Sequence, residues 1–155
     1  MKIVLTTIVI LVFASISSAQ VLEYSEGHYY KNGMLYTGKY TQYYTDKTIK
    51  QVQSIRNGLE DGASELFFEN GLLQEQRSYQ EGQKHGLWFT YNKNGIKIAE
   101  AYYRYNKKDG IWRIWNDNGK LLYEMFYSNG EKVGKWRQWD DTGALVSERD
   151  YSIMK

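Results

Sequence analysis

Glutamates recur in this sequence at a spacing that could carry acid–base chemistry. Glu100, Glu124 and Glu148 are 24 residues apart. General acid–base catalysis of hydrolysis needs two carboxyl groups held about 5 to 10 Å apart across a cleft. Side chains that recur at one interval along a sheet line its face instead, so we expect a solvated row that pairs with neighbours such as Arg113 and Arg137.

Histidine, serine and cysteine offer no catalytic or metal site. His28 and His85 are the only histidines, and more than two units of the repeat described below separate them, whereas a metal site needs several ligands that converge. No serine, histidine and acid cluster together. The chain has no cysteine, which excludes disulfides, thiol nucleophiles and thiolate metal sites. The sequence therefore predicts a protein that is not an enzyme and has no cofactor or metal.

Tryptophan and tyrosine are the residues best suited to bind a partner, because they dominate the binding energy of interfaces. The candidate partner-binding residues are Trp88, Trp112, Trp136, Tyr91, Trp115 and Trp139. A structural interpretation competes with this one, since a residue type fixed by a period also packs each unit against the next. Trp112 and Trp115 are three residues apart, and a strand sends side chains at an odd separation to opposite faces.

Glycines divide the chain into units of 24 residues, and this period decides the fold. The first column of structural glycines contains Gly38, Gly62, Gly86, Gly110 and Gly134. The second contains Gly71, Gly95, Gly119 and Gly143, with Lys47 in the first unit. Aromatic residues keep the same period, with Ser64 in the second unit where later units have tryptophan. We expect the first glycine column to mark backbone positions that reject a side chain.

Each unit has the pattern of a β-hairpin. Residues 111–115 are rich in aromatic and β-branched residues, a turn "NDNG" follows, and residues 120–127 form a longer second strand. A second connection then returns the chain to the next unit. Five such units predict an all-β fold, an elongated single-layer antiparallel β-hairpin repeat array about 50 Å long. In such an array tryptophans of one column lie about 10 Å apart, so a residue of the intervening strand should pack between them.

The N-terminus has the pattern of an export signal. Residues 1–19 place Lys2 before an apolar run and end in small residues, which predicts a signal peptide cleaved after Ala19 and delivery to the periplasm or the extracellular space. Residues 20–37 are similar to the end of a repeat and are expected to form an N-terminal cap or partial repeat. Residues 38–155 are expected to form the repeat array.

The Gly-x-Trp-x-x-Tyr/Trp strand, the Asn/Asp-x-x-Gly turn and the Tyr-x-x-Gly return resemble the MORN repeat over about residues 29–151. More narrowly, they are similar to the bacterial MORN variant found in an antitoxin-like family. The resemblance implies hairpin ribbons that contact proteins or lipids, without catalytic residues. Ser64 and Lys47 depart from the pattern. The predicted export also conflicts with an antitoxin role, because an antitoxin against a cytoplasmic toxin would stay in the cytoplasm.

The net charge of the chain does not identify the class of its partner. The chain has 20 basic and 18 acidic residues, so no strong field favours nucleic acid. We expect an exported scaffold that binds a protein, in an oligomeric state left open. The alternatives are binding to envelope lipid or polysaccharide and an antitoxin or immunity role against a toxin. A lipid or glycan surface could contact the lysines of the return connections, which are Lys84, Lys107, Lys108, Lys132 and Lys135.

Overall fold

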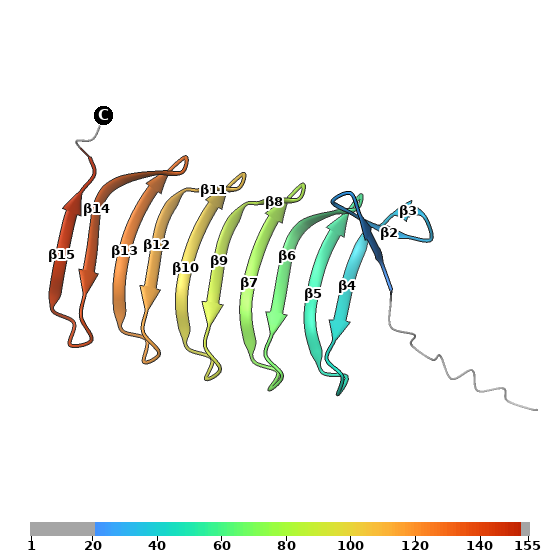
Figure 1. The fold of residues 1–155 in the computed structure, drawn as a ribbon, viewed down its shortest axis with the longest axis horizontal. Helices are drawn as coiled ribbons and strands as arrows, with labels where there is room; N and C mark the ends of the chain where they lie inside the picture. Colours follow the sequence, from blue (N-terminus) through green and yellow to red (C-terminus); the bar gives the residue numbers. More distant parts are fainter. Residues whose placement is uncertain (1–20, 153–155) are drawn as a thin grey trace, which may run out of the picture.

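The computed structural model describes residues 21–152, most of which form a single row of antiparallel strands (Figure 1). The main sheet has the strand order β15-β14-β13-β12-β10-β9-β7-β6-β5-β4, and two short strands, β8 and β11, pair with β7 and β10. Neighbours in the sheet are neighbours in sequence, because every connection is a hairpin or a short return. The predicted fold class, a single-layer hairpin array, is confirmed.

The long strands of the main sheet have similar bounds in successive units. They are β4 (Gly38–Tyr43), β5 (Ile49–Arg56), β6 (Leu59–Phe67), β7 (Leu73–Gln80), β9 (Gly86–Tyr91), β10 (Lys97–Arg104), β12 (Gly110–Trp115), β13 (Leu121–Ser128), β14 (Glu131–Trp139) and β15 (Leu145–Asp150). The short strands are β8 (Gln83–Lys84) and β11 (Lys107–Lys108). With strands about 4.8 Å apart, two long strands advance the array by about 10 Å.

Three short strands, β1 (Glu23–Ser25), β2 (His28–Lys31) and β3 (Met34–Leu35), form a separate sheet at the start of the array (Figure 1). The Tyr29 amide donates to the Gly58 carbonyl at 2.8 Å, and the Gly58 amide donates to the Tyr36 carbonyl at 2.8 Å. These bonds attach the small sheet to the return turn of the first unit. The signal-peptide prediction, residues 1–19, lies outside the described residues.

The return connections are two-residue turns in which both residues have positive φ. In the second unit Glu81 and Gly82 have φ of 48° and 76°, and in the fourth Asn129 and Gly130 have 51° and 94°. This is the type I′ geometry, whose twist matches that of the strands it joins. The Gly82 amide then donates to the carbonyl of Glu60 in the preceding unit at 2.8 Å, so each return turn bonds to its neighbour.

The turns at the opposite edge share another geometry. In one of them the Asn92 amide donates to the Ile96 carbonyl, and the Asn92 side chain accepts the amides of Asn94 and Ile96, all within 3.0 Å. The last turn residue is left-handed, which explains the second glycine column, and Gly95 has φ of 78° there. Lys47 holds the same conformation without being glycine, at φ of 70°.

Replacing Lys47 by glycine should therefore stabilise the protein. A left-handed conformation costs an ordinary residue about 1–2 kcal/mol, and the greater freedom of glycine in the unfolded chain offsets part of that gain. We expect a net gain of about 1 kcal/mol in the free energy of unfolding, measured by urea denaturation. The reverse change, Gly71→Lys, should cost a similar amount, since no atom lies within 4 Å of a β-carbon built there. Unchanged stability in both variants would contradict this strain.

The single layer leaves little of the chain buried. Among residues 21–152, Ile55 is the one buried apolar side chain, at 3% exposure, and most strand residues are half-exposed on one face or the other. Cross-strand contacts and hydrogen bonds between adjacent strands therefore stabilise the array in place of a central core. In the same residues the chain has no helix of the length and apolarity that a membrane crossing requires.

Candidate interaction surface

Aromatic rings form a continuous row along one face of the sheet. We call the face that carries Trp88, Trp112 and Trp136 the tryptophan face. The distances between successive ring centroids are 4.9 to 5.4 Å along the row. Its members are Tyr79, Trp88, Tyr103, Trp112, Tyr127, Trp136 and Tyr151. The expectation that a residue of the intervening strand packs between the tryptophans is confirmed, and that residue is tyrosine.

The indole N–H groups explain why tryptophan recurs in this row. Nε1 of Trp88 donates to the Ser78 carbonyl at 2.9 Å, and Nε1 of Trp112 donates to the Tyr102 carbonyl at 3.1 Å. Only two residue pairs join β7 to β9, because the chain leaves the sheet there to form the return turn. The indole supplies a hydrogen bond where that backbone ladder is interrupted. The tryptophans are thus structural, and a partner would contact their ring surfaces.

Lysines lie over the rings at the same period, a placement that sequence analysis missed. Nζ of Lys84 is 4.8 Å from the Trp88 ring and 5.1 Å from the Tyr103 ring. Nζ of Lys108 is 4.2 Å from the Trp112 ring, and Nζ of Lys132 is 4.5 Å from the Trp136 ring. These three lysines follow the type I′ return turns, and their side chains fold back onto the tryptophan face. Their 24-residue spacing was the signal that could have found them.

The row of rings starts at Tyr79 and does not reach the N-terminal end of the array. Ser64 stands in the tryptophan column and Ile55 in the tyrosine column. Tyr29 of the small N-terminal sheet lies here instead, with its hydroxyl accepting a hydrogen bond from Nε2 of Gln53 at 3.0 Å and its ring 6.1 Å from that of Tyr40. Burial raises the pKa of the Tyr29 phenol. The N-terminal sheet thus covers the tryptophan face in the first units, and the rings from Trp88 onward stay accessible.

The opposite face, which we call the salt-bridge face, carries alternating charges. Arg113 lies between Glu100 and Glu124, at N–O distances of 3.5 and 3.0 Å. Arg137 lies between Glu124 and Glu148, at 3.5 and 2.9 Å. Lys97 and Lys135 end the row, 2.7 Å from Glu100 and 3.0 Å from Glu148. The expected pairing of the glutamate row is confirmed, and each of its carboxylates is neutralised by two cations.

The other predicted partner-binding residues lie on the salt-bridge face. Trp115 is on the side opposite Trp112, and Nζ of Lys97 lies 4.6 Å from its ring. Tyr91 and Trp139 follow Trp88 and Trp136 by three residues on the same strands, so they also face this side. The six candidates therefore form two stripes rather than one site, and both stripes are half-exposed.

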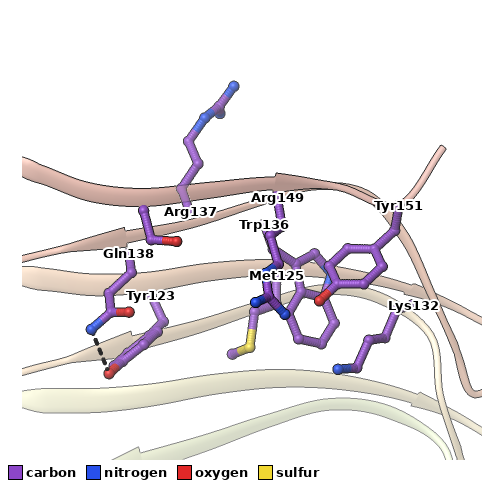
Figure 2. Close-up of a pocket in the computed structure, with 9 residues that line it drawn as sticks. Tyr123, Met125, Lys132, Trp136, Arg137, Gln138, Arg149 and Tyr151 are labelled. Atoms are coloured by element: carbon purple, nitrogen blue, oxygen red, sulfur yellow. Dashed lines mark hydrogen bonds between the residues drawn. The ribbon is translucent and has the colours of Figure 1, made fainter. Parts of the chain in front are cut away.

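A shallow hollow of about 390 Å³ ends the tryptophan face at the last strands (Figure 2). Trp136 and Tyr151 stand beside each other in it, and Nε2 of Gln138 donates to the Tyr123 hydroxyl at 3.0 Å. Hydrogen bonding to Arg149 lowers the pKa of the Tyr151 phenol. None of the nine residues that line the hollow is acidic; they are Tyr123, Met125, Lys132, Trp136, Arg137, Gln138, Ser147, Arg149 and Tyr151.

The salt bridges of this row should make the stability of the protein depend on pH in the acid range. Hydrogen bonds from Arg137 and Lys135 lower the pKa of Glu148 below its ordinary value. A lowered pKa in the folded state stabilises the protein above the unfolded pKa, and that contribution disappears as the pH falls through the folded value. We expect Glu148→Gln to lower the urea midpoint at about pH 7 and to match the wild type at about pH 3. Glu69→Gln, an exposed control outside the row, should leave the urea midpoint unchanged at both pH values. A loss of stability in Glu148→Gln that does not depend on pH would contradict the assignment.

The described residues offer no metal-binding arrangement. Within residues 21–152 no group of three or more His, Cys, Asp or Glu side chains is placed to hold a metal ion. The geometry thus defines the class of the protein, a β-hairpin repeat protein with two open faces. Residues 84–105 and 108–129 each match the family model described as MORN repeat variant. The two matches, within residues 84–129, support a MORN-repeat protein.

MORN repeats commonly serve as scaffolds for contacts with proteins or membranes, and the family is in general non-enzymatic. The two matched segments begin at Lys84 and Lys108, the first two lysines of the tryptophan face. A search of curated proteins found no match to the chain.

Proposed function

We propose that this protein is an exported, non-enzymatic scaffold that binds a protein partner through its tryptophan face. The observation that carries the proposal is the row of seven rings with three lysines over it. These lysines form no ion pair with any described carboxylate, whereas seven charged residues of the opposite face are paired with one another. Tyrosine and tryptophan rings are enriched at interfaces, and cations that are not neutralised within the chain can pair with opposite charges of a partner.

Photocrosslinking from matched positions on the two faces tests the choice of face. Ile114 lies on the tryptophan face with 39% exposure, and Leu87 lies on the salt-bridge face with 45% exposure. A photoreactive amino acid at Ile114 should crosslink to a protein in cells, and the same group at Leu87 should not. The captured protein, identified by mass spectrometry, should then bind the purified chain. Equal capture from both positions, or from Leu87 alone, would disprove binding through the tryptophan face.

Export is the second part of the proposal, and it is supported by the pattern of residues 1–19. Mass spectrometry of the protein recovered from the envelope or the medium should find Gln20 as the first residue. Retention of Met1 in a cytoplasmic fraction would contradict export. It would also make the antitoxin alternative, which needs a cytoplasmic protein, the better one.

Binding to envelope lipid or polysaccharide is the competing function. It is favoured by the same lysines, because an anionic surface attracts each basic residue near it by about 1 kcal/mol. Sedimentation of the purified protein with anionic vesicles or envelope glycan at low salt distinguishes the two functions. Retention that high salt reverses, without a crosslinked protein at Ile114, would favour the surface over a protein partner.

A further inference from the structure

The two faces of the array differ in their balance of charge. In β9, β10, β12, β13, β14 and β15 the alternation of side chains places no Asp or Glu on the tryptophan face. Four cations without an ion pair among the described residues lie on that face, namely Lys84, Lys108, Lys132 and Arg149. A fifth cation, Arg77, lies 5.6 Å from the Trp88 ring and is paired with Glu75 of the same strand. On the salt-bridge face of the same strands, Glu100, Glu124 and Glu148 are all paired with cations. A ligand with negative charge therefore matches the tryptophan face alone.

Contacts with the aromatic rings hold the lysine side chains of the tryptophan face in defined positions. The ammonium groups of Lys84 and Lys108 are each within about 5 Å of two aromatic ring centroids, and their side chains are half-buried. Ordering these side chains before binding reduces the entropy cost of forming an ion pair with a ligand. The lysines recur once per unit, hence about every 10 Å along the row.

This spacing matches an extended polypeptide. In a polyproline II conformation every third residue points to the same side, with a repeat of about 9.3 Å. Acidic side chains at every third position would therefore meet successive lysines, while the residues between them pack on the tyrosine and tryptophan rings. The hollow bounded by Lys132, Arg149 and Tyr151 gives a further carboxylate a place at the end of the row.

We propose that the tryptophan face from Trp88 to Tyr151 binds an extended acidic segment of a partner protein, with acidic residues about three positions apart. This inference rests on the proposed function and names the chemistry of the partner. A segment is favoured over a bilayer because Lys84 and Lys108 are withdrawn between rings. Exposed lysines such as Lys39, Lys93 and Lys107 would contact a flat surface as readily.

Binding is tested with a labelled peptide of about fifteen residues that carries glutamate at every third position and proline or serine between. Two comparison peptides have glutamine in place of glutamate, or the same glutamates in one block. We expect the spaced peptide to bind with a salt-sensitive affinity, the glutamine peptide not to bind, and the block peptide to bind about ten-fold more weakly. Equal binding of the glutamine peptide would overturn acidic recognition, and equal binding of the block peptide would overturn the spacing.

Variants locate the binding face. Replacing Lys84, Lys108 and Lys132 by glutamine should weaken binding about ten-fold or more, and replacing them by arginine should preserve it. The control replaces Lys39, Lys93 and Lys107 by glutamine, which removes the same charge outside the row and should leave affinity nearly unchanged. Circular dichroism checks that each triple variant is folded. An equal loss in the control triple would overturn the assignment of the face.

Tryptophan fluorescence gives a direct readout of the same face. The five tryptophans are Trp88, Trp112, Trp115, Trp136 and Trp139, so a Trp115→Phe and Trp139→Phe background leaves only those of the tryptophan face. Addition of the spaced peptide should shift or quench their emission. Binding to anionic vesicles instead of the peptide would overturn the proposal in favour of a membrane. A protein captured at Ile114 with no peptide binding would overturn only the acidic chemistry and leave the scaffold function standing.

Discussion

Trp112→Ala should lower the free energy of unfolding by about 3 kcal/mol, measured by urea denaturation followed by circular dichroism. Trp112 is the middle ring of the aromatic row, with its centroid 5.2 Å from that of Tyr103 and 5.4 Å from that of Tyr127. The change removes both ring contacts, the hydrogen bond from Nε1 to the Tyr102 carbonyl and the cation–π contact of Lys108. The estimate is near the lower end for tryptophan truncations because the ring is half-exposed.

Two matched variants separate the contributions at this position. Trp112→Phe keeps an aromatic ring and loses the indole N–H, so it should cost about 1 kcal/mol. Ile114→Ala, on the same strand and the same face, should cost about 1 kcal/mol or less, since Ile114 is 39% exposed. An equally small effect of Trp112→Ala and Ile114→Ala would show that the aromatic row does not stabilise the array.

The place of Trp112 in a linear array has a further consequence. Each unit of a repeat array contacts only its neighbours, so stability is a sum of unit and interface contributions. A weakened interface in the middle should allow the units from β12 to β15 to unfold before those from β4 to β10. Hydrogen exchange of Trp112→Ala should then show faster exchange throughout β12–β15, with β5 to β7 still protected.

The sequence predicted the hairpin array because the constraints on its backbone recur visibly. Left-handed turn positions demand glycine, and the second glycine column has φ between 78° and 91° in the structure. The odd spacing of Trp112 and Trp115 correctly predicted opposite faces, since each strand keeps its alternation between them. Local rules of turn and strand geometry were sufficient for these features.

Other features depended on contacts that local rules do not contain. The lysines of the tryptophan face follow two-residue turns, and whether such a side chain points to the edge or onto the rings depends on the twist of the turn. Tyr29 fills the space beside Gln53 through a separate sheet, which the repeat pattern does not describe. The aromatic stripes on both faces are half-exposed, so exposure alone does not show which face binds a partner. The unpaired lysines of the tryptophan face do distinguish the two faces.

Gly110→Val should cost about 2 kcal/mol or more of stability, again measured by urea denaturation. The sequence marked this column as rejecting a side chain, and the structure gives the reason. A β-carbon at residue 110 would come no closer than 3.6 Å to Tyr102, an ordinary van der Waals contact. Space is therefore available, and the obstacle is φ of 63°, which is left-handed and particularly unfavourable for a β-branched residue.

Gly110→Asn is the variant that tests this cause, because asparagine tolerates the left-handed region far better than valine does. It should cost about 1 kcal/mol, roughly half the loss in the valine variant. Gly134→Val should behave like Gly110→Val, since its φ is 62° and its nearest neighbour, Phe126, is 3.8 Å away. If asparagine and valine were equally costly at residue 110, crowding against Tyr102 would be the cause. Conformational strain predicts instead that both glycines reject valine and that residue 110 accepts asparagine more readily.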